Sequence, residues 1–227
     1  MHKVSSLRRW KSTSLVVFRS TGNKGHTETA YIIDPMTLVQ KHKDKAQTGH
    51  NFGEYSLKIF LKIQSLLQTY DRVDMVFDRY DGSESIQNIE RHKRGMSGGG
   101  GDVAIHSDET PIPNWNRFMS NEGNKVRLCN YLVAYIKKQA SMLDHGKTVV
   151  VGGRCVVPTQ AYRIHGGVCE LFPRLFSDHE EADTRMILHA THAFESCSDV
   201  NNIFTGHWFS GDCCTPLQED FAVVYSG

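Results

Sequence analysis

The chain reads TAYIID at residues 29–34 and VDMVFD at residues 73–78, and these two segments decide the fold class. Both are rich in β-branched and aromatic residues and end in aspartate, which is typical of a strand with a carboxylate at its C-terminal tip. Between them, apolar residues recur every three or four positions from Phe52, which predicts a helix to about Thr69. Strand, helix and strand form a βαβ unit, which predicts a parallel sheet with a right-handed crossover.

The chain beyond this unit continues the same alternation. Residues 116–142 are mostly helical by their apolar spacing, and TVVVG at 148–152 follows as a wholly apolar third strand, typical of burial on both faces. Residues 163–176 show no regular period, so we expect an irregular segment there, followed by a helix at 178–194. The expected fold is therefore α/β, with a parallel central sheet and flanking helices.

The length of 227 residues suits one main domain and is too short for two of ordinary size. We expect a poorly ordered segment at 1–25, an α/β domain at 26–200 and a divergent tail at 201–227. Inside the domain, residues 95–113 contain four consecutive glycines, but no GK[ST] follows them and no strand precedes them. A flexible loop is therefore favoured over a phosphate-binding loop.

The overall composition decides little about partners. Lys and Arg number 26 against 25 for Asp and Glu, so the net charge of +1 neither favours nor excludes a nucleic-acid partner. No apolar run is long enough to span a bilayer or to serve for secretion, and the six cysteines lack CxxC spacing. We therefore expect an intracellular chain with reduced thiols and no membrane partner, and the sequence does not indicate an oligomeric state.

Acidic residues gather where a parallel sheet usually places its site, at the carboxyl ends of the strands. Asp34 and Asp78 end the first two predicted strands, and the start of the last predicted helix adds Glu180, Glu181 and Asp183. Crowded carboxylates repel one another unless a cation neutralises them, and oxygen ligands of this kind suit Mg²⁺ or Mn²⁺. Two such ions about 4 Å apart could activate water against a phosphodiester.

Each of these carboxylates also has a purely structural interpretation. Asp34 precedes Pro35, which is typical of a turn, and Asp78 could cap a loop. Acidic residues at the start of a helix are favoured by the helix dipole alone. In the helix at 178–194, one stripe runs through Asp183, Ile187, Ala190 and Phe194, which predicts a buried face opened by an acidic residue.

Cations and histidines flank these acidic residues. The segment 85–94 (SIQNIERHKR) predicts a short helix that carries Arg91, Lys93 and Arg94. Such a run is usually a solvated face, and it would position phosphates only if it lay near the acidic residues. His189 and His192 share a helical turn, but no HExxH motif occurs, and a polar helix face explains them.

Four stretches resemble a family of uncharacterised animal proteins, some of them associated with mobile elements. The match is collinear over about residues 28–200 and rests on IIDPMTLVQ at 32–40, VFDRYDGSESIQNIERHKR at 76–94, NWNRFMSNEGNKVRLCNYL at 114–132 and HEEADTRMILHATHA at 179–193. That family in turn resembles the PIN-like nucleases of the flap endonuclease and XPG group. The resemblance implies a PIN-like three-layer fold and a nuclease that hydrolyses phosphodiester bonds.

The resemblance also implies roles for particular residues. Asp34, Asp78, Glu181 and Asp183 match the carboxylates that bind two Mg²⁺ or Mn²⁺ ions in such nucleases, with Glu180 beside them as a further metal ligand. DNA or RNA is the implied partner, with Arg91, Lys93 and Arg94 on its phosphates, and the nucleus is the implied location.

Three departures from the family pattern bear on activity. Pro35 stands where the family has Gly, and Gln87 stands where it has the Lys that meets the scissile phosphate. The SPDTDVL segment that follows the last helix in the family is replaced by NNIFTGHWFSGDCC after Val200. This change implies that the last strand and its carboxylates are lost or altered. Three hypotheses follow: a metal-dependent nuclease domain, a non-catalytic descendant that binds nucleic acid or a protein, or a non-functional fragment of a mobile-element protein.

Overall fold

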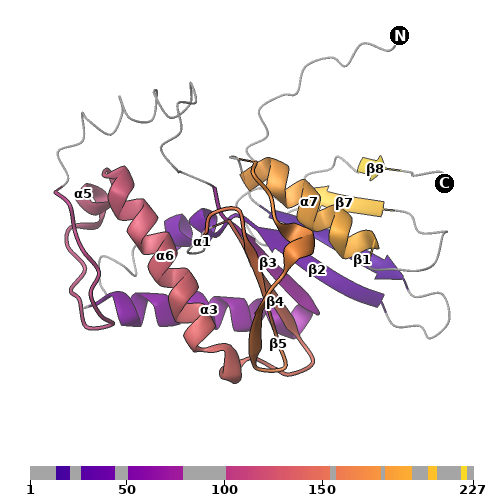
Figure 1. Cartoon of the computed structure of the whole chain (residues 1–227), viewed down its shortest axis with the longest axis horizontal. Coiled ribbons are helices and arrows are strands. Elements are labelled where there is room, and N and C mark those ends of the chain that lie inside the picture. The colour runs from indigo at the N-terminus through magenta and orange to yellow at the C-terminus, as the bar shows by residue number, and fades with distance from the viewer. Residues whose placement is uncertain are drawn as a thin grey trace, which may run out of the picture.

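The structure of the protein is a computed structural model that describes residues 14–20, 27–43, 51–78, 101–153, 157–179, 182–195, 204–208 and 221–223. Within these ranges the chain has an α/β fold, with helices on both faces of one mixed sheet (Figure 1). Eight strands form this sheet in the order β6-β5-β4-β3-β2-β1-β7-β8.

The strands are β1 (Ser14–Ser20), β2 (Thr27–Ile33), β3 (Arg72–Val76), β4 (Thr148–Gly152), β5 (Ala161–His165), β6 (Val168–Leu171), β7 (Phe204–Trp208) and β8 (Phe221–Val223). The helices are α1 (Pro35–Lys41), α3 (Phe52–Thr69), α5 (Trp115–Met119), α6 (Glu122–Lys138) and α7 (Ala182–Glu195), with short 3-10 helices η1 (Ala140–Met142) and η2 (Pro173–Leu175). The predicted helix from Phe52 to about Thr69 and the predicted strand at 148–152 are confirmed.

Only the centre of the sheet is parallel, so the prediction of a parallel sheet holds for three strands. β2 pairs with β3 and β3 pairs with β4 in parallel, and α3 crosses over between the first two. The strands on either side of this centre pair antiparallel. The βαβ pattern predicts the parallel centre correctly, but it carries no information about the antiparallel strands that flank it.

The segment 163–176, expected to be irregular, is largely a β-hairpin. β5 and β6 pair antiparallel with His165 opposite Val168, and β5 also pairs with β4. The turn residues Gly166 and Gly167 have φ values of 57° and 79°, a left-handed conformation that glycine adopts without strain. A two-residue turn of this kind joins antiparallel neighbours, and a Gly-Gly pair between two short β-prone runs is the sequence signal for it.

Further strands lie on the side of β2 away from β3. β1 pairs antiparallel with β2, from Ser14 opposite Ile33 to Ser20 opposite Thr27, and β7 and β8 follow it. β1 lies in the segment 1–25, for which the sequence predicts poor order, and β7 and β8 lie in the predicted divergent tail. The apolar, β-prone residues of SLVVFRS account for β1. In its place beside β2, β1 completes the hydrogen bonding of β2 on that side.

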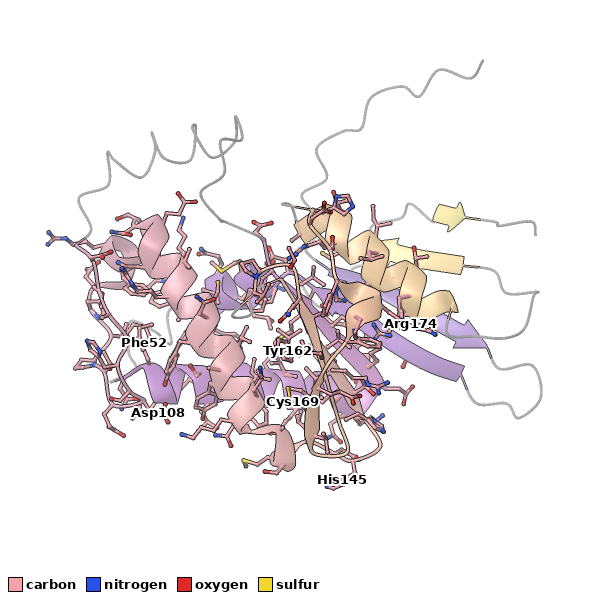
Figure 2. The ribbon with its side chains drawn as sticks, in the orientation of Figure 1. Phe52, Asp108, His145, Tyr162, Cys169 and Arg174 are labelled. Atoms are coloured by element: carbon pink, nitrogen blue, oxygen red, sulfur yellow. The ribbon has the colours of Figure 1, made fainter. Side chains whose placement is uncertain are left out.

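Alternate residues of the central strands point to two different helical layers. Val73 and Met75 of β3 belong to the main core, which packs against α3, α5 and α6. Val76 of β3 and Ile32 of β2 belong to a second cluster beneath α7. Figure 2 shows Tyr162 of the hairpin near α6, consistent with the Lys137 ammonium 3.5 Å from its ring centre. The result is a three-layer arrangement.

Candidate functional site

The carboxyl ends of β2 and β3 form one edge of the sheet, which we call the carboxyl edge. The two strands are parallel, with Ile33 opposite Met75. Asp34 directly follows the last residue of β2, and Asp78 lies two residues beyond Val76, the last residue of β3. Two of the predicted site residues therefore lie at the same edge, where ligands usually bind in α/β folds.

Asp34 caps the short helix α1. Its Oδ1 atom accepts a hydrogen bond from the backbone N–H of Met36 at 2.8 Å, and Pro35 occupies the first position of the helix. Proline is well suited to that position because its missing N–H has no partner within the helix anyway. The carboxylate therefore has a structural role, close to the turn-forming interpretation of the Asp-Pro pair.

Asp78 joins the carboxyl edge to α7. Its Oδ1 atom accepts a hydrogen bond from the backbone N–H of Ala182, the first residue of α7, at 2.7 Å. A carboxylate in this place satisfies an N–H that has no partner within the helix and interacts favourably with the helix dipole. The start of α7 is thereby held against the end of β3, although the bonded residues are 104 positions apart in the sequence.

The other predicted site residues are described only in part or not at all. Asp183 is the second residue of α7, so its backbone lies next to the Ala182–Asp78 contact, but its side chain is outside the description. The remaining candidates also lie outside the described residues, namely Glu180, Glu181, Arg91, Lys93 and Arg94. Among the side chains that the structure describes, no cluster of three or more His, Cys, Asp or Glu could hold a metal ion.

The donor chemistry of the carboxyl edge suits a hard cation. Asp34 and Asp78 offer carboxylate oxygens, the ligand type that Mg²⁺ and Mn²⁺ prefer. The helix caps already orient both side chains through short hydrogen bonds from backbone amides. Supporting hydrogen bonds of this kind orient metal ligands in other proteins. The two carboxylates therefore fit the ion in donor type and are held by hydrogen bonds of the kind that orient metal ligands.

The buried face of α7 differs from the predicted stripe. Of the predicted stripe, Ala190 is buried as expected but Ile187 is 58% exposed, and Arg185, Met186 and His189 are buried instead. The prediction that a polar face explains the histidine is therefore wrong for His189. Its place is available because Gly152 of β4 has no side chain, and a Cβ there would lie 2.6 Å from His189 Nε2. Apolar periodicity cannot reveal a face that buries charged and polar groups.

Arg185 is a site residue that the sequence reasoning missed. The residue is only 2% exposed, yet it lies at the carboxyl edge and its guanidinium donates to backbone carbonyls of three separate segments. The acceptors are Phe77, which precedes Asp78, together with Pro158 and Ser177. No sequence signal for this role exists at short range, because the three acceptors are main-chain atoms.

A second buried polar cluster lies between β3 and α7. Asp74 is fully buried and accepts two hydrogen bonds of 2.6 Å from Arg72, and its Oδ2 lies 2.7 Å from Nδ1 of His189. Burial opposes ionisation of Asp74, but the Arg72 guanidinium and the His189 hydrogen bond outweigh it and hold the pKa of the carboxyl below its usual value. The cluster ties the centre of the sheet to α7.

His192 extends this cluster toward the surface. Its Nδ1 lies 3.1 Å from Nη1 of Arg72, and because guanidinium only donates, Nδ1 accepts and the ring is neutral. Burial and the nearby charge of Arg72 lower the pKa of His192 to about 4, with smaller contributions from Arg174 and His189, while Asp74 acts in the opposite direction.

This shift predicts a pH-dependent loss of stability. Unfolded, His192 takes up a proton below its ordinary pKa of 6.5, whereas the folded protein resists protonation down to about 4. The free energy of unfolding should therefore fall as the pH drops from 6.5 toward 4. His192→Gln, which keeps an acceptor for Arg72, should show a smaller loss between pH 7 and pH 5 in urea unfolding followed by circular dichroism. If the wild type and His192→Gln lose the same free energy of unfolding between pH 7 and pH 5, His192 is not the source of the pH dependence.

The fold and the carboxyl edge define a three-layer α/β protein with a mixed sheet. No family model matches the chain, and neither the curated proteins nor the solved structures contain a match. Among the described residues, no helix is both long enough and apolar enough to cross a membrane.

Proposed function

We propose that the chain is a PIN-like, metal-dependent nuclease domain that acts at the carboxyl edge. The supporting observation is that Asp34 and Asp78 follow adjacent parallel strands and that the first turn of α7, which contains Asp183, is bonded to Asp78. In this proposal, Asp34, Asp78, Glu181 and Asp183 hold Mg²⁺ or Mn²⁺, with Glu180 as a further ligand.

The ion would supply a water molecule activated for attack on a phosphodiester, together with neutralisation of the charge on the phosphate. The chain orients the ligands. Asp34 is held by the amide of Met36 and Asp78 by the amide of Ala182, so neither carboxylate rotates freely. Arg91, Lys93 and Arg94 are proposed to contact the phosphates of DNA or RNA, and the proposed location is intracellular, in the nucleus.

A second candidate function is non-catalytic binding of nucleic acid or of a protein at the same edge. The observation that favours it is that both carboxylates already act as helix caps, which accounts for them without a metal. The replacement of the family's SPDTDVL segment supports the same candidate, because it removes the last pair of expected ligands.

Cleavage assays with charge-neutralising variants distinguish the two candidates. The substrates are labelled single-stranded, flap and hairpin DNA and RNA, with Mn²⁺ in the buffer. Asp34→Asn and Asp78→Asn keep an oxygen acceptor for the capped amides but remove the negative charge. Each should reduce the cleavage rate by more than the roughly 10- to 100-fold that loss of a supporting residue costs at a metal site.

The matched control is Asp144→Asn. Asp144 accepts a hydrogen bond from the Gly146 amide at 2.8 Å, as Asp34 does from Met36, but it precedes β4 and so lies at the other end of the strands. The control should cleave like the wild type. Folded wild-type protein that binds a labelled strand without cutting it would support the second candidate instead.

A further inference from the structure

We propose that Arg185 is a positioning residue that aligns the Asp78 carboxylate by fixing the backbone around it. Its guanidinium connects α7 to the end of β3 and to the two loops that reach the carboxyl edge, 157–160 and 176–179. The consequence for cleavage rests on the proposed nuclease function, whereas the alignment itself is a property of the fold and can be tested alone.

The first step is the pairing of consecutive residues with one turn of α7. Asp78 Oδ1 accepts from the Ala182 amide at 2.7 Å, and the carbonyl of Phe77 accepts from Arg185 Nη1 at 3.3 Å. Ala182 and Arg185 are three residues apart and therefore lie on the same side of the helix. The side chain of Asp78 and the backbone just before it are thus both bonded to a single surface of α7.

The second step concerns the loops. Arg185 Nη2 donates to the carbonyl of Ser177 at 2.7 Å and to that of Pro158 at 2.9 Å. These loops are also joined directly, because the Ser177 amide donates to the Thr159 carbonyl at 2.9 Å. A planar guanidinium carries five N–H donors in a rigid arrangement, so it can serve three carbonyls at once, which the single ammonium of lysine cannot do in the same geometry.

The third step is the space reserved for this side chain. Gly153 has a φ of 100°, and a Cβ at that position would lie 2.1 Å from Arg185 Nη1 and 2.5 Å from the Phe77 carbonyl oxygen. Phe77 is in turn bonded to the neighbouring strand, through its amide and the Gly152 carbonyl at 2.9 Å. The guanidinium therefore occupies a gap bounded by main chain, where small displacements of the arginine are transmitted to Phe77 and Asp78.

The test compares Arg185→Lys with Arg163→Lys, an exposed arginine whose partner is Glu170 in the hairpin. Hydrogen exchange of the full-length protein should show that Arg185→Lys lowers protection of the Ala182 amide at least about tenfold, which is about 1.4 kcal/mol. The Met36 amide, capped by Asp34, should change little, and Arg163→Lys should change neither amide. Unchanged protection at Ala182 in folded Arg185→Lys overturns the proposal.

A kinetic measurement separates positioning from general stability. In the cleavage assay, Arg185→Lys should lower kcat and leave KM close to that of the wild type, because the ligand carboxylate is misaligned while the nucleic-acid surface is intact. A change in KM alone overturns the proposal. If the wild type does not cleave at all, the nuclease function fails, and hydrogen exchange at Ala182 still decides the role of Arg185.

A measurement on the wild type covers the case in which Arg185→Lys does not fold. The geometry predicts that the Nη protons of Arg185 exchange slowly with solvent, because all three carbonyl contacts must open first. Their exchange by nuclear magnetic resonance should be at least about 100-fold slower than that of the exposed Arg163 guanidinium, because exchange requires local opening. Exchange at equal rates in the two arginines overturns the proposal.

Discussion

Replacing Asp74 with alanine should lower the free energy of unfolding by about 3–5 kcal/mol, which is a large part of the stability of an ordinary domain. Asp74 is fully buried and is bonded to Arg72 on its own strand and to His189 on α7. Its removal leaves the Arg72 guanidinium, whose side chain is 15% exposed, and the buried His189 ring without their carboxylate partner. Urea unfolding followed by circular dichroism measures the change.

A second arginine–aspartate pair provides a matched control. Arg127 donates two hydrogen bonds of 2.6 Å to Asp102, the same distances as in the Arg72–Asp74 pair. The Asp102 side chain is 69% exposed, so water replaces the lost contacts in Asp102→Ala and stability should change little. Similar losses in the two variants would show that pair geometry, rather than burial, sets the effect.

Gly153→Ala should be the second most damaging change and should lower the free energy of unfolding by about 2–5 kcal/mol. A left-handed backbone costs a residue with a Cβ about 1–2 kcal/mol, and overpacking of a buried site adds about 1–3 kcal/mol. Both terms apply because φ is 100° and the new Cβ would lie 2.1 Å from Arg185 Nη1 and 2.5 Å from the carbonyl oxygen of Phe77. Thermal or urea unfolding of the variant measures the sum.

Gly166→Ala separates the two terms. Gly166 has a φ of 57°, but nothing lies within 4 Å of a Cβ built there. This variant should therefore show only the backbone term of about 1–2 kcal/mol. If Gly153→Ala is no more destabilising than Gly166→Ala, Arg185 and Phe77 can move aside, and the tight packing described for the carboxyl edge is wrong.

The central part of the fold could be predicted from local patterns. The period of apolar residues identified α3, and the β-branched runs identified β2, β3 and β4. The hairpin of β5 and β6 was missed because its strands are short and its exposed residues, such as Val168, blur the alternation. Its Gly166–Gly167 turn was the better signal, since it depends on backbone conformation rather than on burial.

The candidate site could be predicted only where it depends on chain order. Asp34 and Asp78 were expected at one edge because parallel strands bring their carboxyl ends together, and the structure places them there. The Asp-Pro pair indicates a turn close to the observed Met36 contact, but the pattern around Asp78 predicts a loop cap, and the bond from the Ala182 amide comes from a helix distant in sequence. Whether the edge binds a metal and cuts nucleic acid stays a prediction, tested by the Asp34 and Asp78 variants.

The sequence by itself determined the order of strands and helices at the centre of the fold and the carboxylates at the ends of β2 and β3, because these depend on residues a few positions apart. Only the tertiary structure decided that α7 buries Arg185 and His189. That outcome needs main-chain carbonyls, the carboxylate of Asp74 and the space left by Gly153, which come from segments distant in sequence. Burial of a charge is favourable only where such partners converge, and no local pattern records that convergence.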